Sequence, residues 1–466
     1  MVKTIPNEGL IHFRGFFNQD RLLLTDPGSL SEVLVSKTYE FTKPSGARNF
    51  LRIVLGDGLI IVEGEEHKFQ RKHIMPVFGF RHIKELYPIF WSKAISLTHG
   101  IVAEIQDKPM YSVGEKSKLT GEVNIGHWAN KVTMDIIGLA GLGREFNALK
   151  NSEDELVKNY EEILEPTKEK AIYFAVNVLF GTKIVKMLPW KINERMKITT
   201  TTLREICRQF VRDQRQLIKA QGTDHLDILS ILIKSNNFSD DQLVDQLLTF
   251  LAAGHETTSS AFTWTTYLLA ANPEYQTRLR AEVQRHVPSP WSKDSGDLSS
   301  ILESLPLLNA VCNEVLRLYP TVPVTVRVSD HTTTIQGTTV PPYTQIILAP
   351  WAVNRSPHLW GDNSEDFVPE RWIDYDAASG MRPEDGRPNN HGGAGSNYSI
   401  LTFLHGPRSC IGQGFAKAEL RAILAAFIGA FEWTLAKPDD PVEPAGVITT
   451  KTKDPLILRL TQLDPW

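Results

Sequence analysis

Cysteine is scarce in this chain of 466 residues, which has only Cys207, Cys312 and Cys410. An odd number of widely spaced cysteines argues against a disulfide framework, and no pair has the CxxC spacing of a metal site. Free cysteines are typical of proteins in reducing surroundings. The chain also lacks a strong excess of charge, since its net charge is -4. We therefore expect no nucleic-acid partner.

Long hydrophobic runs are also missing. No stretch has the roughly 18–20 apolar residues that a membrane-spanning helix needs. The start, MVKTIPNEGLIHFRGFF, is too polar for a signal peptide or an anchor helix. We expect one domain over residues 1–466, without an N-terminal membrane anchor. Neither a P-loop nor a G-x-G-x-x-G after a strand occurs, so no pattern indicates an NADPH or flavin site.

Helical patterns dominate the middle of the chain. Ser239 and Gln242 have the spacing of a capping box, and the apolar pattern after them predicts a buried helix that Pro273 ends. The other expected elements are helices over residues 307–319 and 412–433 and short strands over residues 322–330, 333–353 and 455–460. The sequence thus predicts a mainly α fold with small β-sheets.

The segment FLHGPRSCIG, from Phe403 to Gly412, holds one of the three cysteines. Three features favour the thiolate form of Cys410. A helix is expected directly after it, glycines let backbone N–H groups approach the sulfur, and Arg408 adds positive charge. A lone thiolate without another soft ligand nearby suits the axial position of a haem iron. Cys207 and Cys312 are interpreted as buried structural cysteines.

The pattern F-x-x-G-x-R-x-C-x-G resembles the haem-binding loop of the cytochrome P450 family. The resemblance extends from about Gly56 to Leu460 and is closest to the eukaryotic microsomal type, with a fungal character in the residues after Cys410. It implies the haem-thiolate fold and haem b as cofactor. It also implies that Cys410 binds the iron and that Phe403 lies at the haem.

The resemblance implies a set of residues that bind the two haem propionates. These are Arg408, Arg71, Arg327 and His67. The family usually has Trp where this chain has His67, but histidine can still donate to a carboxylate. For each arginine the simpler alternative is a charge on the protein surface.

Glu314 and Arg317 are three residues apart on an expected helix, so their side chains can pair. A surface ion pair is the commonest meaning of this spacing, but the apolar neighbours here favour burial, which requires further hydrogen bonds. The resemblance adds Arg371, in the segment FVPERW, as a third partner. It implies that the three residues have a structural role.

The segment AGHETT, residues 253–258, puts a glycine and polar side chains inside the long apolar helix. The residues alone leave two readings open, a kinked core helix and a proton relay in a locally opened helix. The resemblance implies the relay, with Thr257 and Glu256 as the catalytic pair. Thr257 would hydrogen-bond dioxygen, and Glu256 would supply protons. Ala253 and Gly254 would leave space beside the haem.

The resemblance implies a monooxygenase that inserts one oxygen atom of dioxygen into a lipophilic small molecule, in fungal secondary metabolism. Its electron donor would be an NADPH-dependent flavoprotein reductase, and its location the cytosolic face of the endoplasmic reticulum membrane. Two alternatives stay open. One is a haem-thiolate isomerase, dehydratase or peroxygenase that needs no reductase. The other is a truncated, inactive haem-binding protein.

Overall fold

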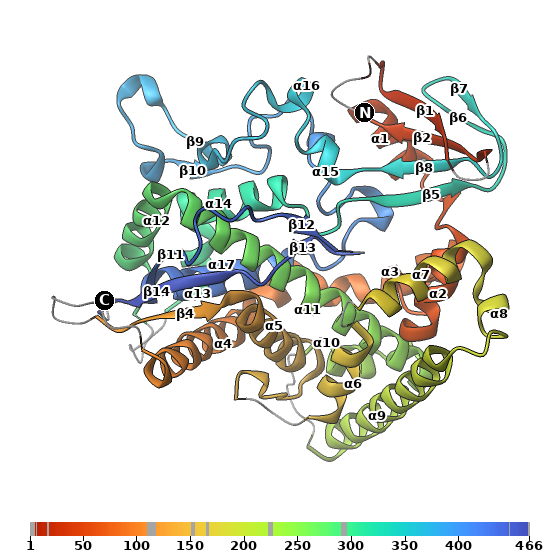
Figure 1. Ribbon diagram of the computed structural model, residues 1–466, viewed down its shortest axis with the longest axis horizontal. Coiled ribbons are helices and arrows are strands. Elements are labelled where there is room, and N and C mark those ends of the chain that lie inside the picture. The colour runs from red at the N-terminus through yellow and green to blue at the C-terminus, as the bar shows by residue number, and fades with distance from the viewer. Residues whose placement is uncertain are drawn as a thin grey trace.

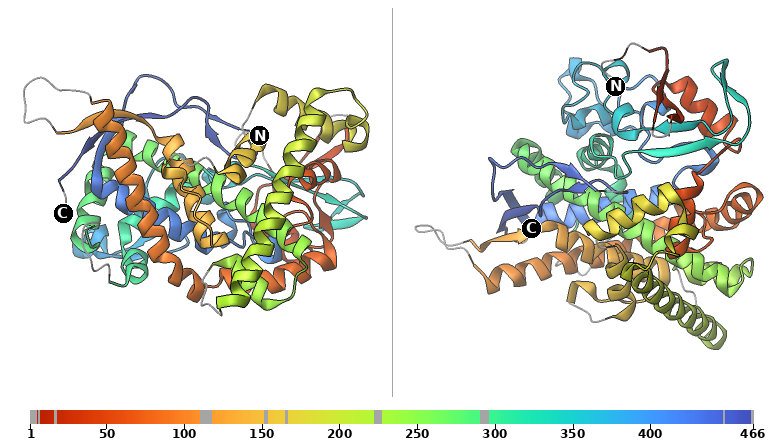
Figure 2. Two further views of the ribbon diagram at one scale, coloured as in Figure 1. Left: turned by 90° about the horizontal axis from the view of Figure 1, so that it is seen from below. Right: turned by 45° about the vertical axis from the view of Figure 1, so that its right-hand side comes forward.

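A computed structural model describes residues 5, 7–15, 18–109, 118–150, 154–164, 167–221, 227–289, 296–446 and 448–464. Most of them form a large helical body, and a smaller part built around a five-stranded sheet lies beside it (Figures 1 and 2). The mainly α fold with small sheets is therefore confirmed.

The helices are α1 (Pro27–Ser31), α2 (Ser45–Leu55), α3 (Gly64–Ile74), α4 (Phe80–Asp107), α5 (Ile125–Ile136), α6 (Glu155–Leu164), α7 (Lys168–Phe180), α8 (Thr182–Val185), α9 (Lys191–Gln221), α10 (Ile228–Ser235), α11 (Asp240–Ala271), α12 (Pro273–His286), α13 (Leu298–Ser304), α14 (Pro306–Leu318), α15 (Pro350–Val353), α16 (Pro357–Trp360) and α17 (Gln413–Ala430). Short π and 3₁₀ turns used below are η4 (Ile137–Gly141), η6 (Pro369–Trp372) and η10 (Gly406–Arg408).

The strands are β1 (Leu10–Arg14), β2 (Asp20–Leu24), β3 (Phe41–Thr42), β4 (Thr120–Asn124), β5 (Thr325–Ser329), β6 (Thr333–Ile335), β7 (Thr338–Val340), β8 (Gln345–Leu348), β9 (Ile373–Asp374), β10 (Arg387–Pro388), β11 (Phe431–Leu435), β12 (Pro444–Ala445), β13 (Lys451–Thr452) and β14 (Ile457–Gln462). The five-stranded sheet has the order β1-β2-β8-β5-β3, and a three-stranded sheet has the order β11-β14-β4.

Helix α11 runs through the centre of the molecule (Figure 1). Its first turn carries the predicted capping box, because Ser239 accepts a hydrogen bond from the backbone of Gln242 and the Gln242 side chain accepts one from Ser239. The helix ends before Pro273, as predicted. It packs against α5, α9, α17 and α14, so its side chains are buried on most of its circumference.

Two sequence-based boundaries are wrong. Residues 350–353, expected in a strand, form helix α15, since Pro350 suits a first helical position. The last long helix ends at Ala430 instead of Trp433, and Phe431 begins strand β11, which pairs with β14. An apolar run that continues from a helix into a strand gives no periodicity signal at the junction.

Among the residues that the structure describes, no helix contains an apolar stretch long enough to cross a bilayer.

Candidate active site

The loop that carries Cys410 is fixed by its own backbone. The Cys410 N–H donates to the carbonyl oxygen of Phe403 at 2.8 Å, which closes the loop ahead of α17. Gly406, in η10, has φ 72°, and a Cβ there would lie 2.2 Å from the carbonyl oxygen of Leu34. The loop can approach the Leu34 backbone this closely only with glycine at position 406.

The thiol of Cys410 differs from the other two thiols in its surroundings. Burial raises the pKa of Cys207 and of Cys312 to about 12, and both side chains lie in the core. Burial also raises the pKa of Cys410, but a hydrogen bond from the Gly412 N–H and the charge of Arg71 act in the opposite direction. The side chain of Cys410 is nevertheless exposed.

The cation that acts on Cys410 is Arg71, and not Arg408 as the sequence suggested. Arg71 reaches across from α3 and donates to the carbonyl oxygen of Ser409 at 2.6 Å and to its hydroxyl at 3.3 Å. Arg408 instead turns away, towards a buried carboxylate, Glu63. Its sequence position beside the cysteine gave no sign of this direction.

Four basic side chains and Glu63 gather next to the cysteine loop. Glu63 pairs with Lys43 at 3.1 Å and with Arg408, whose side chain is only 4% exposed. Arg327 is buried behind them, and burial together with the charge of Arg408 lowers its pKa to about 10. Burial lowers the pKa of Lys43 to about 8 and, with Arg408, that of His67 to about 4.

This cluster, which we call the cation cluster, has more positive charge than its one carboxylate neutralises. Two of the guanidinium nitrogens of Arg408, Nε and Nη1, are buried and make no hydrogen bond, although Nη1 forms the ion pair with Glu63. Buried charges without matching partners are costly, so the arrangement fits a ligand that brings negative charge. With the exposed thiol of Cys410 beside it, the donor set fits a haem, whose iron takes a thiolate and whose propionates take cations.

Glu314 lies at the centre of a second, fully buried cluster. Its carboxylate accepts two hydrogen bonds from Arg317, each at 2.8 Å, and one from the indole of Trp372 at 2.9 Å. Arg371, in η6, lies 3.5 Å from the same carboxylate, so the structure brings the three predicted residues together. The side chains of Glu314 and Arg317 are 0% exposed. Their charges are matched, as burial requires.

Asn354 connects this cluster to the cysteine loop. Arg317 donates to the Asn354 carbonyl oxygen at 2.8 Å, and the Asn354 side chain accepts from the Leu401 N–H at 2.7 Å. The same amide donates to Thr402, which in turn donates to the carbonyl oxygen of Leu316. The buried ion pair thus fixes the start of the segment that leads to Cys410.

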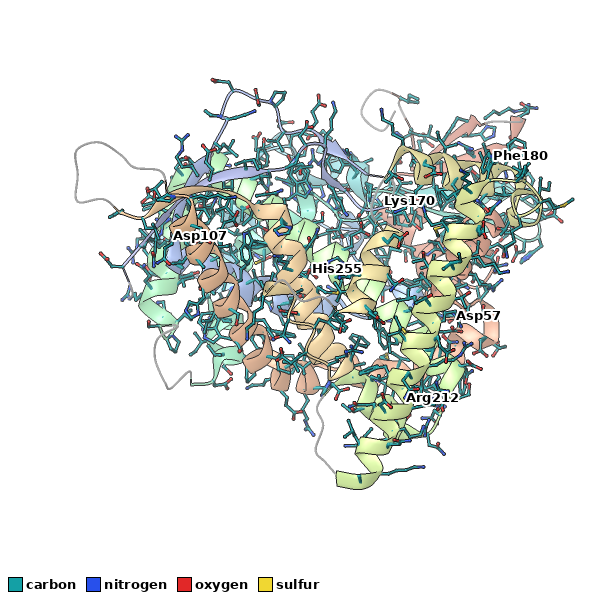
Figure 3. All side chains as sticks on the ribbon, turned by 60° about the horizontal axis from the view of Figure 1, so that its bottom comes forward. Asp57, Asp107, Lys170, Phe180, Arg212 and His255 are labelled. Carbon is teal, nitrogen blue, oxygen red and sulfur yellow. The ribbon has the colours of Figure 1, made fainter. Side chains whose placement is uncertain are left out.

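The polar residues of α11 lie in an unbroken helix, so no local opening is present there. The hydroxyl of Thr257 donates to the Ala253 carbonyl oxygen at 2.6 Å. Glu256 pairs with Lys451, from strand β13, at 2.6 Å. His255 is buried in the interior (Figure 3), and burial lowers its pKa to about 4, so it is neutral at pH 7.

Gly254 is needed for helix packing. A Cβ at this position would lie 2.7 Å from the Cδ1 atom of Ile137, in η4. The expectation that Gly254 leaves space beside the haem is corrected in this respect, because Ile137 fills the place of its missing side chain. Ala253, by contrast, is exposed, while Ala252 and Gly254 on either side of it in α11 are partly buried.

Comparison with known proteins gives the same class as the site. The family model for cytochrome P450 matches residues 15–458. Cytochrome P450 monooxygenase sphH of Aspergillus fumigatus is 42% identical over all of this chain and 83% of its own length. Cytochrome P450 monooxygenase ptmK of Penicillium ochrochloron is 37% identical over 99% of this chain and 88% of its own length. The chain belongs to the cytochrome P450 family and is a monooxygenase with a haem-thiolate cofactor.

Sequence reasoning missed four residues that shape the site, namely Lys43, Glu63, Asn354 and Lys451. Each acts through a contact with a residue far away in the chain, and none lies in a recognisable motif. Glu63 directly precedes helix α3, which contains Arg71. An acidic residue at a helix start is the one local feature that could have drawn attention to Glu63.

Proposed function

We propose that this monooxygenase inserts one oxygen atom of dioxygen into a lipophilic small molecule in fungal secondary metabolism, with haem b held by Cys410. The observation that carries the proposal is the pairing of an exposed thiol with a buried cation cluster whose positive charges outnumber its one carboxylate. When bound, the haem supplies the oxygen chemistry, and the protein binds, orients and protects it.

We assign the individual residues the roles that the family resemblance implies, and their positions support these roles. Arg408, Arg327, Arg71 and His67 bind the haem propionates, and Phe403 and Ala253 line the haem. Gly254 lets α11 pack closely, and Glu314, Arg317 and Arg371 hold the core that supports the loop.

Glu256 and Thr257 form the proton relay. Glu256 is only 17% exposed, yet its partner Lys451 is 34% exposed, so this ion pair connects the interior with solvent. The Thr257 hydroxyl already donates to Ala253. A hydroxyl can donate its hydrogen and accept a hydrogen bond at the same time, which suits Thr257 to pass on the protons that Glu256 supplies.

A lipophilic substrate fits the apolar surfaces near the site. In α2 and α7, Phe50 packs edge-on against Phe174 with ring centres 5.0 Å apart. The family resemblance also implies that Val324, Val447 and Ile448 line the substrate, and the side chains of Val324 and Ile448 are about half exposed. Val447, expected with them, lies outside the described residues.

The redox partner of this P450 is an NADPH-dependent flavoprotein reductase. The P450 itself lies at the cytosolic face of the endoplasmic reticulum membrane. Support for a membrane surface comes from large apolar side chains that are more than half exposed on α7 and around α8. These are Ile172, Leu179, Phe180, Ile184 and Met187. Helices α7 and α8 contact each other, and exposed apolar side chains on neighbouring elements are typical of an interaction surface.

The decisive experiment is the absorption spectrum of the reduced holoprotein with carbon monoxide. A thiolate-ligated haem gives a strongly red-shifted Soret band, which we expect for the wild type and not for Cys410→Ser. Cys312→Ser is the matched control and keeps the band. A wild type that lacks the band with haem fully loaded contradicts the proposal. Turnover is also measured with and without NADPH and reductase. A requirement for both supports monooxygenation, and turnover without them supports a reductase-free haem-thiolate reaction.

A further inference from the structure

Lys451 contacts the acid of the relay from an unexpected part of the chain. It lies in β13, which pairs with β12 to form a small hairpin near the C-terminal end of the chain. Its Nζ atom is 2.6 Å from Oε1 of Glu256. Lys451 and Glu256 are almost two hundred positions apart in the sequence, so the contact depends on how the hairpin is seated on α11.

The seat of this hairpin is one face of α11. Ser260 and Trp264 follow Glu256 at intervals of four residues and therefore share its face. Both donate to the carbonyl oxygen of Thr450, and the Trp264 indole does so at 3.0 Å. The residue before Lys451 is thus anchored on the same face of α11 that carries Glu256.

Thr450 is also anchored from the opposite side. Its N–H donates to the Thr321 carbonyl oxygen at 2.9 Å, and its hydroxyl donates to the Pro320 carbonyl oxygen at 3.1 Å. Thr449 and Thr450 are buried, whereas Ile448 just before them is 48% exposed. The same short segment therefore carries an apolar side chain suited to a substrate and a cation bound to the relay acid.

We propose that Lys451 is a positioning residue for Glu256, and that it couples the seating of the 448–451 segment to proton delivery. The inference rests on the proposed role of Glu256. An ammonium held by the hairpin restricts the Glu256 carboxylate to one orientation. Removing it leaves a partly buried carboxylate free to take several orientations, which slows proton transfer to Thr257. His255, which precedes Glu256 on α11, is buried, and burial lowers its pKa to about 4, so it is neutral at pH 7.

The hairpin supplies its own matched control. Lys453, two residues further on, pairs with Glu443 at 2.6 Å, but both side chains of this pair are more than half exposed. Lys453→Met removes the same charge from the same hairpin. Lys451→Arg keeps the charge at the tested position, so it separates positioning by charge from proton donation by the amine itself.

The first readout does not depend on turnover. Thermal unfolding of the holoprotein is compared for the wild type, Lys451→Met, Glu256→Gln and the double variant. We expect Lys451→Met to lower the Tm of the wild type. In the Glu256→Gln background, the same substitution should lower the Tm by less than half of that amount. Equal shifts in both backgrounds show that the pair is not formed and overturn the inference.

The second readout is the fraction of electrons from NADPH that is released as hydrogen peroxide, with a flavoprotein reductase and palmitic acid as the lipophilic probe. Peroxide takes up two electrons and two protons per dioxygen. We expect Lys451→Met to raise this fraction several-fold, Lys451→Arg to restore it, and Lys453→Met to leave it unchanged. An unchanged fraction in Lys451→Met, or no rescue by arginine, overturns the positioning role. A wild type that oxidises no NADPH refutes the proposed function instead, and the relay with it.

Discussion

At the scale of single residues, the Glu314–Arg317 pair is the contact whose loss has the largest predictable cost. Both side chains are fully buried, so removing one leaves the other charge without a partner. Glu314→Ala should reduce the free energy of unfolding by about 3–5 kcal/mol. Urea denaturation of the holoprotein measures this. Asp385→Asn, which breaks the exposed pair with Arg382, is the control and should change little. Similar effects of the two variants would contradict the buried pair.

The residues of the site differ in how far the sequence could predict them. Glu314 and Arg317 have the i,i+3 spacing that predicts a pair, and the structure shows this pair buried. The motif around Cys410 predicts an iron ligand, and that role stays a prediction. Arg408 shows what a motif does not predict. The motif identifies this arginine, but it does not indicate that the side chain points towards Glu63. Side-chain direction depends on partners from other elements, and a single sequence does not identify these partners.

At the scale of elements, α11 depends on its first turn. Ser239 and Gln242 satisfy each other's backbone N–H groups there. Ser239→Ala should reduce the free energy of unfolding by about 1 kcal/mol. Ser239→Asp retains an acceptor and should recover most of this loss. Chemical denaturation of both variants makes the comparison, and an aspartate variant as unstable as the alanine variant argues against the cap.

The contact between α11 and η4 is equally specific. Gly254→Val should place methyl groups against Ile137 and cost about 1–3 kcal/mol in stability. Gly395→Val is the matched control, because no atom lies within 4 Å of a Cβ there. The Tm difference between the two variants is the measurement. Equal values would mean that η4 moves aside without cost.

Element boundaries were predictable where a cap or a proline marks them. Ser239 and Pro273 fixed both ends of α11, whereas the end of α17 was placed too late. Phe431 and Trp433 belong to a strand because β14 is available to pair with them. Such pairing between distant segments leaves no mark in the local pattern.

At the scale of the whole molecule, two buried histidines make stability depend on pH. The pKa of His67 and that of His255 are each lowered to about 4, mainly by burial, from an unfolded value of 6.5. Between these values the unfolded chain binds more protons, so stability falls as the pH drops from 6.5 towards 4. For His255 the loss is at most about 3 kcal/mol.

His255→Gln should flatten this dependence. The unfolding free energy of the wild type and the variant is measured by urea denaturation between pH 6.5 and pH 5. His12→Gln, at a histidine whose side chain is 56% exposed, should keep the wild-type slope. If His255→Gln and the wild type have the same slope, His255 is not a buried neutral side chain.

The sheet β11-β14-β4 has its latest strand in the middle. On the ribosome, β4 and β11 emerge first and have no common partner until β14 leaves the exit tunnel. The hairpin with Lys451 precedes β14 by only a few residues. A nascent chain therefore exposes two unpaired strand edges, and leaves Glu256 without its cation, until β13 and β14 have been synthesised. Chaperones that cover such edges would have their greatest effect on this protein before β14 emerges.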